Sequence, residues 1–175
     1  EVEIVDLEQG KHVLAAGEIG EIRLRGPQLM RDYRNLPEET AITLRDGWLY
    51  TGDIGEFDTD GYLYIRDRKK EMAKVSGYNV FPREIEDVLY MHPAVQEAAV
   101  IAVPDAYRGE VVQAFVVLRP QHSATEQELG EHCKANLTKY KLPAQISVVP
   151  ELPKTGVGKI DKNRLRADSM NEAGG

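Results

Sequence analysis

A short basic stretch over residues 68–83 is the feature that most constrains how this sequence can fold. It carries five positive side chains and one negative, although the whole chain has a formal net charge of −7. The hydrophobic pattern changes at the same point, because strand patterns precede the stretch and a mixture of helix and strand patterns follows it. We therefore predict two domains, the first over residues 1–66 and the second over residues 67–175.

The residues before this boundary predict a β-rich unit. Polar and apolar residues alternate in its second strand, which places Ile22 and Leu24 on a buried face and Glu21 in water. A later strand ends at Gly52 and Asp53, and an Asp-Gly pair then supplies the positive φ of a hairpin turn. The predicted strands span residues 1–6, 20–25, 47–53, 54–58 and 62–65, with one helical turn over 37–41.

The residues after the boundary combine helices and strands within about 110 residues, the size of one small α+β domain. Pro82 suits the first turn of a helix, where its missing N–H group costs nothing. Thr125 and Glu128 form a capping-box pair that opens another helix. The predicted helices begin at residues 82, 125 and 161, and the predicted strands span residues 95–103, 111–118 and 145–149.

Composition excludes several classes of protein. The longest apolar run, residues 98–104, is too short to span a membrane, and the single cysteine excludes an internal disulfide. The acidic balance, with a pI near 5.2, argues against a protein that binds nucleic acid. With 42% hydrophobic residues, the chain is expected to form packed domains. Because the sequence shows neither a membrane-spanning run nor the pattern of a secretion signal, the protein is expected to be cytoplasmic.

Two segments near the boundary carry side chains that can take part in chemistry. Asp53 follows a glycine, and a carboxylate there can accept hydrogen bonds from the two hydroxyls of a ribose. The alternative is a turn aspartate that binds only local backbone N–H groups. The basic stretch leads into Ser76, Gly77 and Tyr78, a glycine-centred loop that allows a phosphate-bearing ligand to approach the backbone. The alternative for this stretch is a solvated surface.

A third segment, residues 153–159, contains two glycines and ends in Lys159. A Walker loop requires glycine at its first position and Ser or Thr after its lysine, whereas Pro153 and Ile160 stand there. The Walker interpretation therefore fails. Two interpretations stay open, namely a flexible loop that presents Lys159 to a site formed elsewhere and a hairpin tip with an exposed lysine.

Other reactive residues indicate structural roles. Cys133 lies on the apolar stripe of its predicted helix, which favours a buried, unreactive thiol. Residues 58–61 are similar to the start of a calcium loop, but Lys69 stands where that loop needs glutamate, so they predict a turn. No spacing typical of a metal site or a catalytic pair relates the four histidines, which are His12, His92, His122 and His132.

Four motifs follow one another along the chain. They are residues 17–22 (GEIGEI), 48–53 (WLYTGD), 67–71 with 76–86 (DRKKE and SGYNVFPREIE) and 153–159 (PKTGVGK). In this order they resemble the C-terminal portion of the adenylate-forming superfamily, which includes acyl-CoA synthetases, nonribosomal peptide synthetase adenylation domains and luciferases. The likeness covers residues 17–170 and looks closest to fatty acid–CoA ligases. It implies an α+β fold, with the β-rich end of a large domain followed by a small mobile domain.

The resemblance implies a role for each candidate residue. Asp53 would hold the ribose hydroxyls of ATP and of the acyl-adenylate, and Arg68 would contact the same ribose or a phosphate. Lys70 falls on the hinge position about which the small domain rotates. Lys159 matches the lysine that bridges the reacting carboxylate and the α-phosphate. Residues 76–78 would line the pantetheine path in the second, thioester-forming orientation.

The resemblance also implies what a full-length parent would contain. The phosphate loop and the acyl pocket of the family lie upstream of the residues present here, so the isolated chain is expected to be inactive. The parent would be an AMP-forming acyl-CoA synthetase that uses a carboxylic acid (a fatty acid), ATP and CoA, with Mg²⁺ ligands outside this chain. A non-catalytic binding or regulatory module on the same scaffold, and an adenylation domain that loads a carrier protein, are the alternatives.

Overall fold

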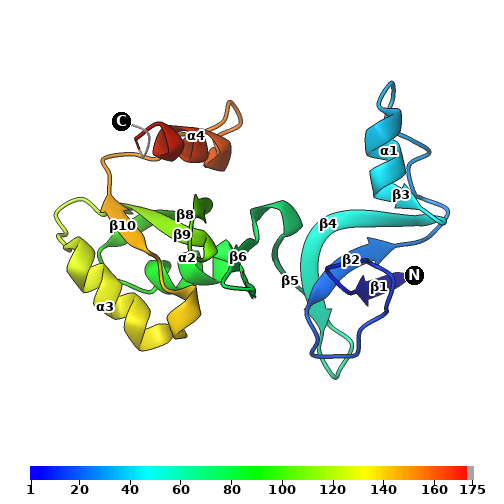
Figure 1. Cartoon of the computed structure of the whole chain (residues 1–175), viewed down its shortest axis with the longest axis horizontal. Coiled ribbons are helices and arrows are strands. Elements are labelled where there is room, and N and C mark those ends of the chain that lie inside the picture. Colours follow the sequence, from blue (N-terminus) through cyan, green and yellow to red (C-terminus); the bar gives the residue numbers. More distant parts are fainter. Residues whose placement is uncertain (173–175) are drawn as a thin grey trace. The chain divides into compact units, whose positions relative to one another are not determined.

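The computed structural model describes residues 1–172, and the chain divides into two compact units between Lys70 and Glu71. The first unit is an antiparallel sheet built around one long strand, β4, which pairs with β2 along one edge and with β3 and β5 along the other (Figure 1). β1 extends the sheet beyond β2. The elements of this unit are β1 (Val2–Val5), β2 (Gly20–Leu24), α1 (Pro37–Thr43), β3 (Leu44–Arg45), β4 (Trp48–Phe57) and β5 (Leu63–Arg68).

Two predictions for the first unit are wrong. Residues 47–53 and 54–58 form the single strand β4, so Asp53 lies inside a strand and not at its end. The β4–β5 register shifts just after this residue, and Gly52 has a φ of +69°, which glycine adopts without strain. Glu21 is buried instead of facing water, because β2 has a paired strand on each edge and the ammonium of Lys69 covers the carboxylate.

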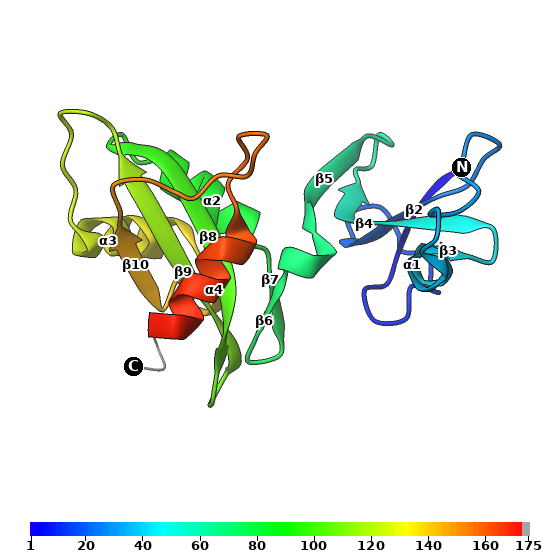
Figure 2. The ribbon, with the colours of Figure 1, turned by 90° about the horizontal axis from the view of Figure 1, so that it is seen from above.

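The second unit is a mixed sheet with helices on both faces (Figure 2). The strands run in the order β10-β9-β6-β7, and β8 also pairs with β9. The β10–β9 pair is parallel, whereas the β6–β7, β6–β9 and β8–β9 pairs are antiparallel. A single 3₁₀ turn, η1, spans the boundary between the units. The elements are η1 (Lys69–Glu71), β6 (Ala73–Val75), β7 (Tyr78–Val80), α2 (Pro82–Tyr90), β8 (Val95–Asp105), β9 (Gly109–Leu118), α3 (Glu126–Asn136), η2 (Lys139–Lys141), β10 (Gln145–Val148) and α4 (Lys162–Glu172).

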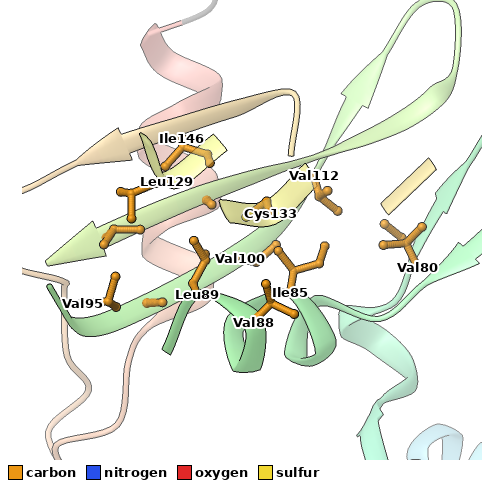
Figure 3. Close-up of a cluster of buried hydrophobic side chains, with 14 of the residues drawn as sticks. Val80, Ile85, Val88, Leu89, Val95, Val100, Val112, Leu129, Cys133 and Ile146 are labelled. Atoms are coloured by element: carbon orange, nitrogen blue, oxygen red, sulfur yellow. The ribbon is translucent and has the colours of Figure 1, made fainter. Parts of the chain in front are cut away.

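Apolar side chains cover both faces of β8 and β9. On one face, α2 and α3 pack against the strands through side chains such as Leu89, Val100 and Leu129 (Figure 3). On the other face, Leu165 of α4 packs in a separate cluster with Ile101 of β8. Because helices cover both faces, β8 is a nearly continuous apolar run and does not alternate with polar residues.

The predicted helices and long strands of the second unit are confirmed, including the capping box of Thr125 and Glu128 and the proline at the start of α2. The β6–β7 hairpin was missed, because each of its strands has only three residues. Its two turn residues, Ser76 and Gly77, have φ values of +50° and +86°, which is the backbone pattern of a tight two-residue hairpin. Within residues 1–172, no helix is both long enough and apolar enough to cross a membrane.

Candidate functional site

Asp53 and Arg68 face each other across two paired strands of the first unit. They are partners in the β4–β5 register, and Nε of Arg68 lies 2.9 Å from Oδ1 of Asp53. The side chain of Asp53 is 29% exposed and that of Arg68 is 58% exposed. The pair is therefore ordered by mutual contact and still open to a ligand.

Thr51 supports the irregular backbone that precedes Asp53. Its hydroxyl donates to the Ile22 carbonyl oxygen at 2.8 Å and accepts the Asp53 N–H at 3.0 Å. These bonds satisfy backbone groups at the point where the regular ladder is interrupted. No backbone N–H group within residues 1–172 donates to the Asp53 carboxylate, so the alternative of a locally satisfied turn aspartate is wrong.

An open cleft of about 1140 Å³ lies beside this pair, entirely within the first unit. Residues of α1, of β4 and of the end of β5 line it. Its lining includes the Asp53 carboxylate and the cations Arg68, Lys69 and Lys70. The volume is on the scale of sites that hold small organic ligands, and the mixed charges suit a ligand that has both hydroxyl and anionic groups.

Lys159 stands near the end of a narrow loop that joins β10 to α4. Lys154 and Ile160 form an isolated β-bridge at the base of the loop, and the Thr155 N–H donates to the Lys159 carbonyl oxygen at 2.7 Å. The local structure is therefore a hairpin tip, one of the two interpretations of this segment. The Lys159 side chain is exposed, and its ammonium has no hydrogen-bond or ion-pair partner within residues 1–172.

Ion pairs hold the base of this loop. Nζ of Lys154 lies 2.6 Å from Oε1 of Glu97 on β8, and Nζ of Lys162 lies 2.6 Å from Oε1 of Glu86 on α2. The same Glu86 oxygen accepts the Val100 N–H at 2.8 Å. The backbone that carries Lys159 is thus fixed at both ends, whereas the amine at its tip is free to move.

The β6–β7 hairpin exposes Ser76, Gly77 and Tyr78 in the second unit. The Ser76 N–H donates to the Arg108 carbonyl oxygen at 2.9 Å. The ring of Tyr78 stacks on that of Tyr140 from η2, with ring centroids 4.6 Å apart and planes inclined by 21°. Sequence reasoning missed this stack, because no spacing or motif relates the two tyrosines.

The histidines and the cysteine lie outside these groups. The rings of His92 and His132 meet edge to face at 5.2 Å, a contact that their spacing did not indicate. Burial raises the pKa of the Cys133 thiol to about 11, so the thiol is protonated near neutral pH and the expected buried, unreactive cysteine is confirmed. Within residues 1–172, no three His, Cys, Asp or Glu side chains lie close enough to hold a metal ion.

Comparison with known proteins identifies the scaffold. Residues 84–159 match the family model described as AMP-binding enzyme C-terminal domain. The long-chain-fatty-acid–CoA ligase of Bacillus subtilis (strain 168) is 51% identical over 90% of this chain and 28% of its own length. The medium/long-chain-fatty-acid–CoA ligase FadD8 of Mycobacterium tuberculosis is 45% identical over 95% of this chain and 30% of its own length. The chain thus spans less than a third of the length of these relatives.

Solved structures give the same result. The chain matches ATP-bound MatB from Rhodopseudomonas palustris with a TM-score of 0.89 and 37% identity, over 96% of this chain and 33% of that one. It matches o-succinylbenzoate CoA synthetase (MenE) from Bacillus subtilis, in complex with the acyl-adenylate OSB-AMP, with a TM-score of 0.84 and 38% identity, over 94% and 34%. It also matches the amide bond synthetase McbA from Marinactinospora thermotolerans, with a TM-score of 0.87 and 40% identity, over 95% and 34%. The chain therefore belongs to the adenylate-forming superfamily and carries the C-terminal portion of such an enzyme.

Proposed function

We propose that this chain is the C-terminal part of an AMP-forming fatty acid–CoA ligase. Such an enzyme joins a carboxylate to the α-phosphate of ATP with release of pyrophosphate, and the thiol of CoA then displaces AMP to give a thioester. The contrast between a paired Asp53 and Arg68 and an unpaired Lys159 ammonium supports the proposal most directly. Identity of 51% to a long-chain-fatty-acid–CoA ligase supports a fatty acid as the carboxylate.

Asp53 is suited to hold the ribose of the nucleotide. A carboxylate offers about four lone-pair positions, and Nε of Arg68 lies nearest to Oδ1 of Asp53. The remaining positions can accept both vicinal hydroxyls of a ribose. Arg68 neutralises the carboxylate and, being the more exposed partner, can also reach a phosphate.

Lys159 is suited to the first of the two reactions. Attack of a fatty acid carboxylate on ATP brings two anions together, so an ammonium at that point lowers the barrier electrostatically. The exposed, unpaired amine on an anchored loop can enter a site formed by other residues and leave it again. A compact ammonium on a flexible stem suits this motion better than a planar guanidinium.

Residues 76–78 are suited to the second reaction. In our proposal, rotation about Lys70 withdraws Lys159 and brings the β6–β7 turn to the same site, where its exposed backbone lines the path of the pantetheine. The stacked rings of Tyr78 and Tyr140 then give that path a flat apolar wall. Mg²⁺ would accompany ATP and offset the charge of its phosphates, with ligands outside this chain. A cytoplasmic location of the protein stays a prediction.

The test uses the chain joined to the upstream residues of its parent. We expect AMP and acyl-CoA to form only when a fatty acid, ATP, Mg²⁺ and CoA are all present. We expect no exchange between ATP and pyrophosphate from residues 1–175 alone. Failure of the full-length protein to adenylate any acid would favour the non-catalytic module. Transfer to a phosphopantetheinyl carrier protein, or to an amine, in preference to free CoA would contradict the ligase assignment.

A further inference from the structure

Three consecutive residues at the boundary between the units differ in how they are anchored. Nζ of Lys69 lies 2.7 Å from Oε2 of Glu21, and both belong to the first unit. Glu71 pairs with Arg166 of α4, and both belong to the second unit. Lys70, between them, is exposed, and its side chain forms no hydrogen bond or ion pair within residues 1–172.

The carboxylate of each ion pair is largely shielded from water. The side chain of Glu21 is 5% exposed and that of its partner Lys69 is 34% exposed, whereas those of Glu71 and Arg166 are 12% and 21% exposed. Removing one partner of a shielded pair leaves an uncompensated charge, so such a pair resists opening, whereas an exposed pair contributes little. Each pair therefore holds the backbone on its own side of Lys70.

Regular structure continues the anchoring on both sides. Before Lys69, Arg68 is still paired with Asp53 in the β4–β5 ladder. Soon after Glu71, the buried residue Ala73 begins β6. The unanchored part of the connection is thus reduced to Lys70 and the bonds next to it.

We propose that the Glu21–Lys69 and Glu71–Arg166 pairs are clamps that confine rotation between the units to Lys70. This inference rests on the proposed function. Arg166 lies on the helix that follows the Lys159 loop, so the second clamp ties the pivot to the element that positions Lys159. Glu21, Glu71 and Arg166 are then positioning residues. Loss of either clamp adds a second flexible joint, and Lys159 reaches the reacting atoms over a wider range of positions.

The experiment compares clamp variants with matched variants in the full-length enzyme. Glu21→Gln and Glu71→Gln open the clamps without changing side-chain shape. Glu3→Gln and Glu84→Gln remove ion pairs elsewhere in the first and second units, with Arg23 and Lys141 as the partners left behind. Two quantities are measured, namely the distribution of distances between spin labels placed in the two units and the kinetics of adenylation.

We expect both clamp variants to broaden the distance distribution, and the matched variants to leave its width unchanged. A displacement of about 1 Å at a reacting group can slow a reaction about 100-fold, so kcat for adenylation should fall between about 10- and 100-fold. KM for ATP should change less than about twofold, since Asp53 and Arg68 are unchanged in both variants. The paired swap Glu71→Arg with Arg166→Glu should restore the narrow distribution, and Arg166→Lys serves as the milder change if Glu71→Gln does not fold.

Unchanged distributions in both clamp variants, or equal broadening in Glu3→Gln and Glu84→Gln, would overturn the proposal. The proposed function and the clamp proposal can be contradicted independently of each other. A wild-type enzyme that adenylates no acid contradicts the proposed function, whereas the distance distributions still decide whether the clamps confine the motion.

Discussion

The two units hold their candidate side chains in opposite ways. In the first unit, Asp53 and Arg68 are bound to each other on paired strands. In the second unit, the loop backbone around Lys159 is anchored, but its ammonium contacts no described partner. A fixed pair suits a nucleotide that stays in place through both reactions, whereas a free ammonium suits a charge that is needed in only one of them. In the proposed function, the difference separates groups that are organised before the ligand binds from a group that is delivered to it.

The largest effect is expected from Lys159→Ala in the full-length enzyme. Loss of an electrostatic group at the reacting atoms typically costs about 100-fold or more in rate, so exchange between ATP and pyrophosphate should fall by at least that factor. Lys134→Ala removes an exposed lysine on α3 and should leave exchange unchanged. A loss of less than about tenfold on Lys159→Ala would mean that the free ammonium has no such role.

A core substitution tests whether the units are separate packing units. Leu89 is fully buried between α2 and the sheet, so Leu89→Ala should lower the free energy of unfolding of the second unit by about 2–5 kcal/mol. Hydrogen exchange should accelerate in β8 and β9 and stay unchanged in β2 and β4. The exposed Met91 provides the matched control, Met91→Ala. Equal acceleration in both sheets would show that the units unfold together.

Asp53→Asn tests the fixed pair with a smaller expected effect. The amide keeps the shape of the side chain but weakens charge-assisted hydrogen bonds, so KM for ATP should rise about tenfold in steady-state kinetics. The exposed turn residue Asp60 offers a control of the same chemistry, Asp60→Asn, which should not change KM. An unchanged KM for ATP in Asp53→Asn would mean that Asp53 does not bind the nucleotide.

The smallest effect concerns a local contact that no proposal uses. The N–H and hydroxyl of Thr125 donate to the Glu128 carboxylate, and these hydrogen bonds hold its pKa below the ordinary value. Because the pKa of Glu128 is lower in the folded state, its ionised carboxylate stabilises the folded protein at pH values above the unfolded pKa of about 4.3. This stabilisation is lost as the pH falls through the pKa that Glu128 has in the folded state. The difference in urea midpoint between wild type and Glu128→Gln should therefore shrink between about pH 6 and pH 3. A difference that stays constant over this range would contradict the linkage.

The parts of the fold that local sequence determines were predictable. The capping box of Thr125 and Glu128 lies within one turn of chain, and the apolar runs of β8 and β9 are long enough to identify. Glu21 was placed wrongly because its partner, Lys69, comes from a distant part of the chain and makes burial of the carboxylate possible. Asp53 was placed at a strand end because an irregularity at Gly52 has the same sequence signature as a turn.

The candidate site also combines residues that could be predicted from the sequence with contacts that could not. Asp53, Arg68, Lys70 and Lys159 could be chosen from motifs, because each lies in a short segment with a distinctive order of residues. The stack of Tyr78 on Tyr140 and the pairing of Glu71 with Arg166 could not, because each joins segments that meet only in the folded unit. Motifs therefore indicated the groups that we propose to contact substrates, and only the structure showed the contacts around them.

Thioester formation from supplied acyl-adenylate tests the contrast between the units most directly. The assay compares Lys159→Ala with Asp53→Asn in the full-length enzyme, in a single turnover with excess CoA. The account predicts that Lys159→Ala forms thioester at nearly the wild-type rate, whereas Asp53→Asn is slowed because the same ribose contacts hold the adenylate. If Lys159→Ala loses thioester formation as severely as it loses adenylation, the lysine is not a group that serves one reaction and then withdraws.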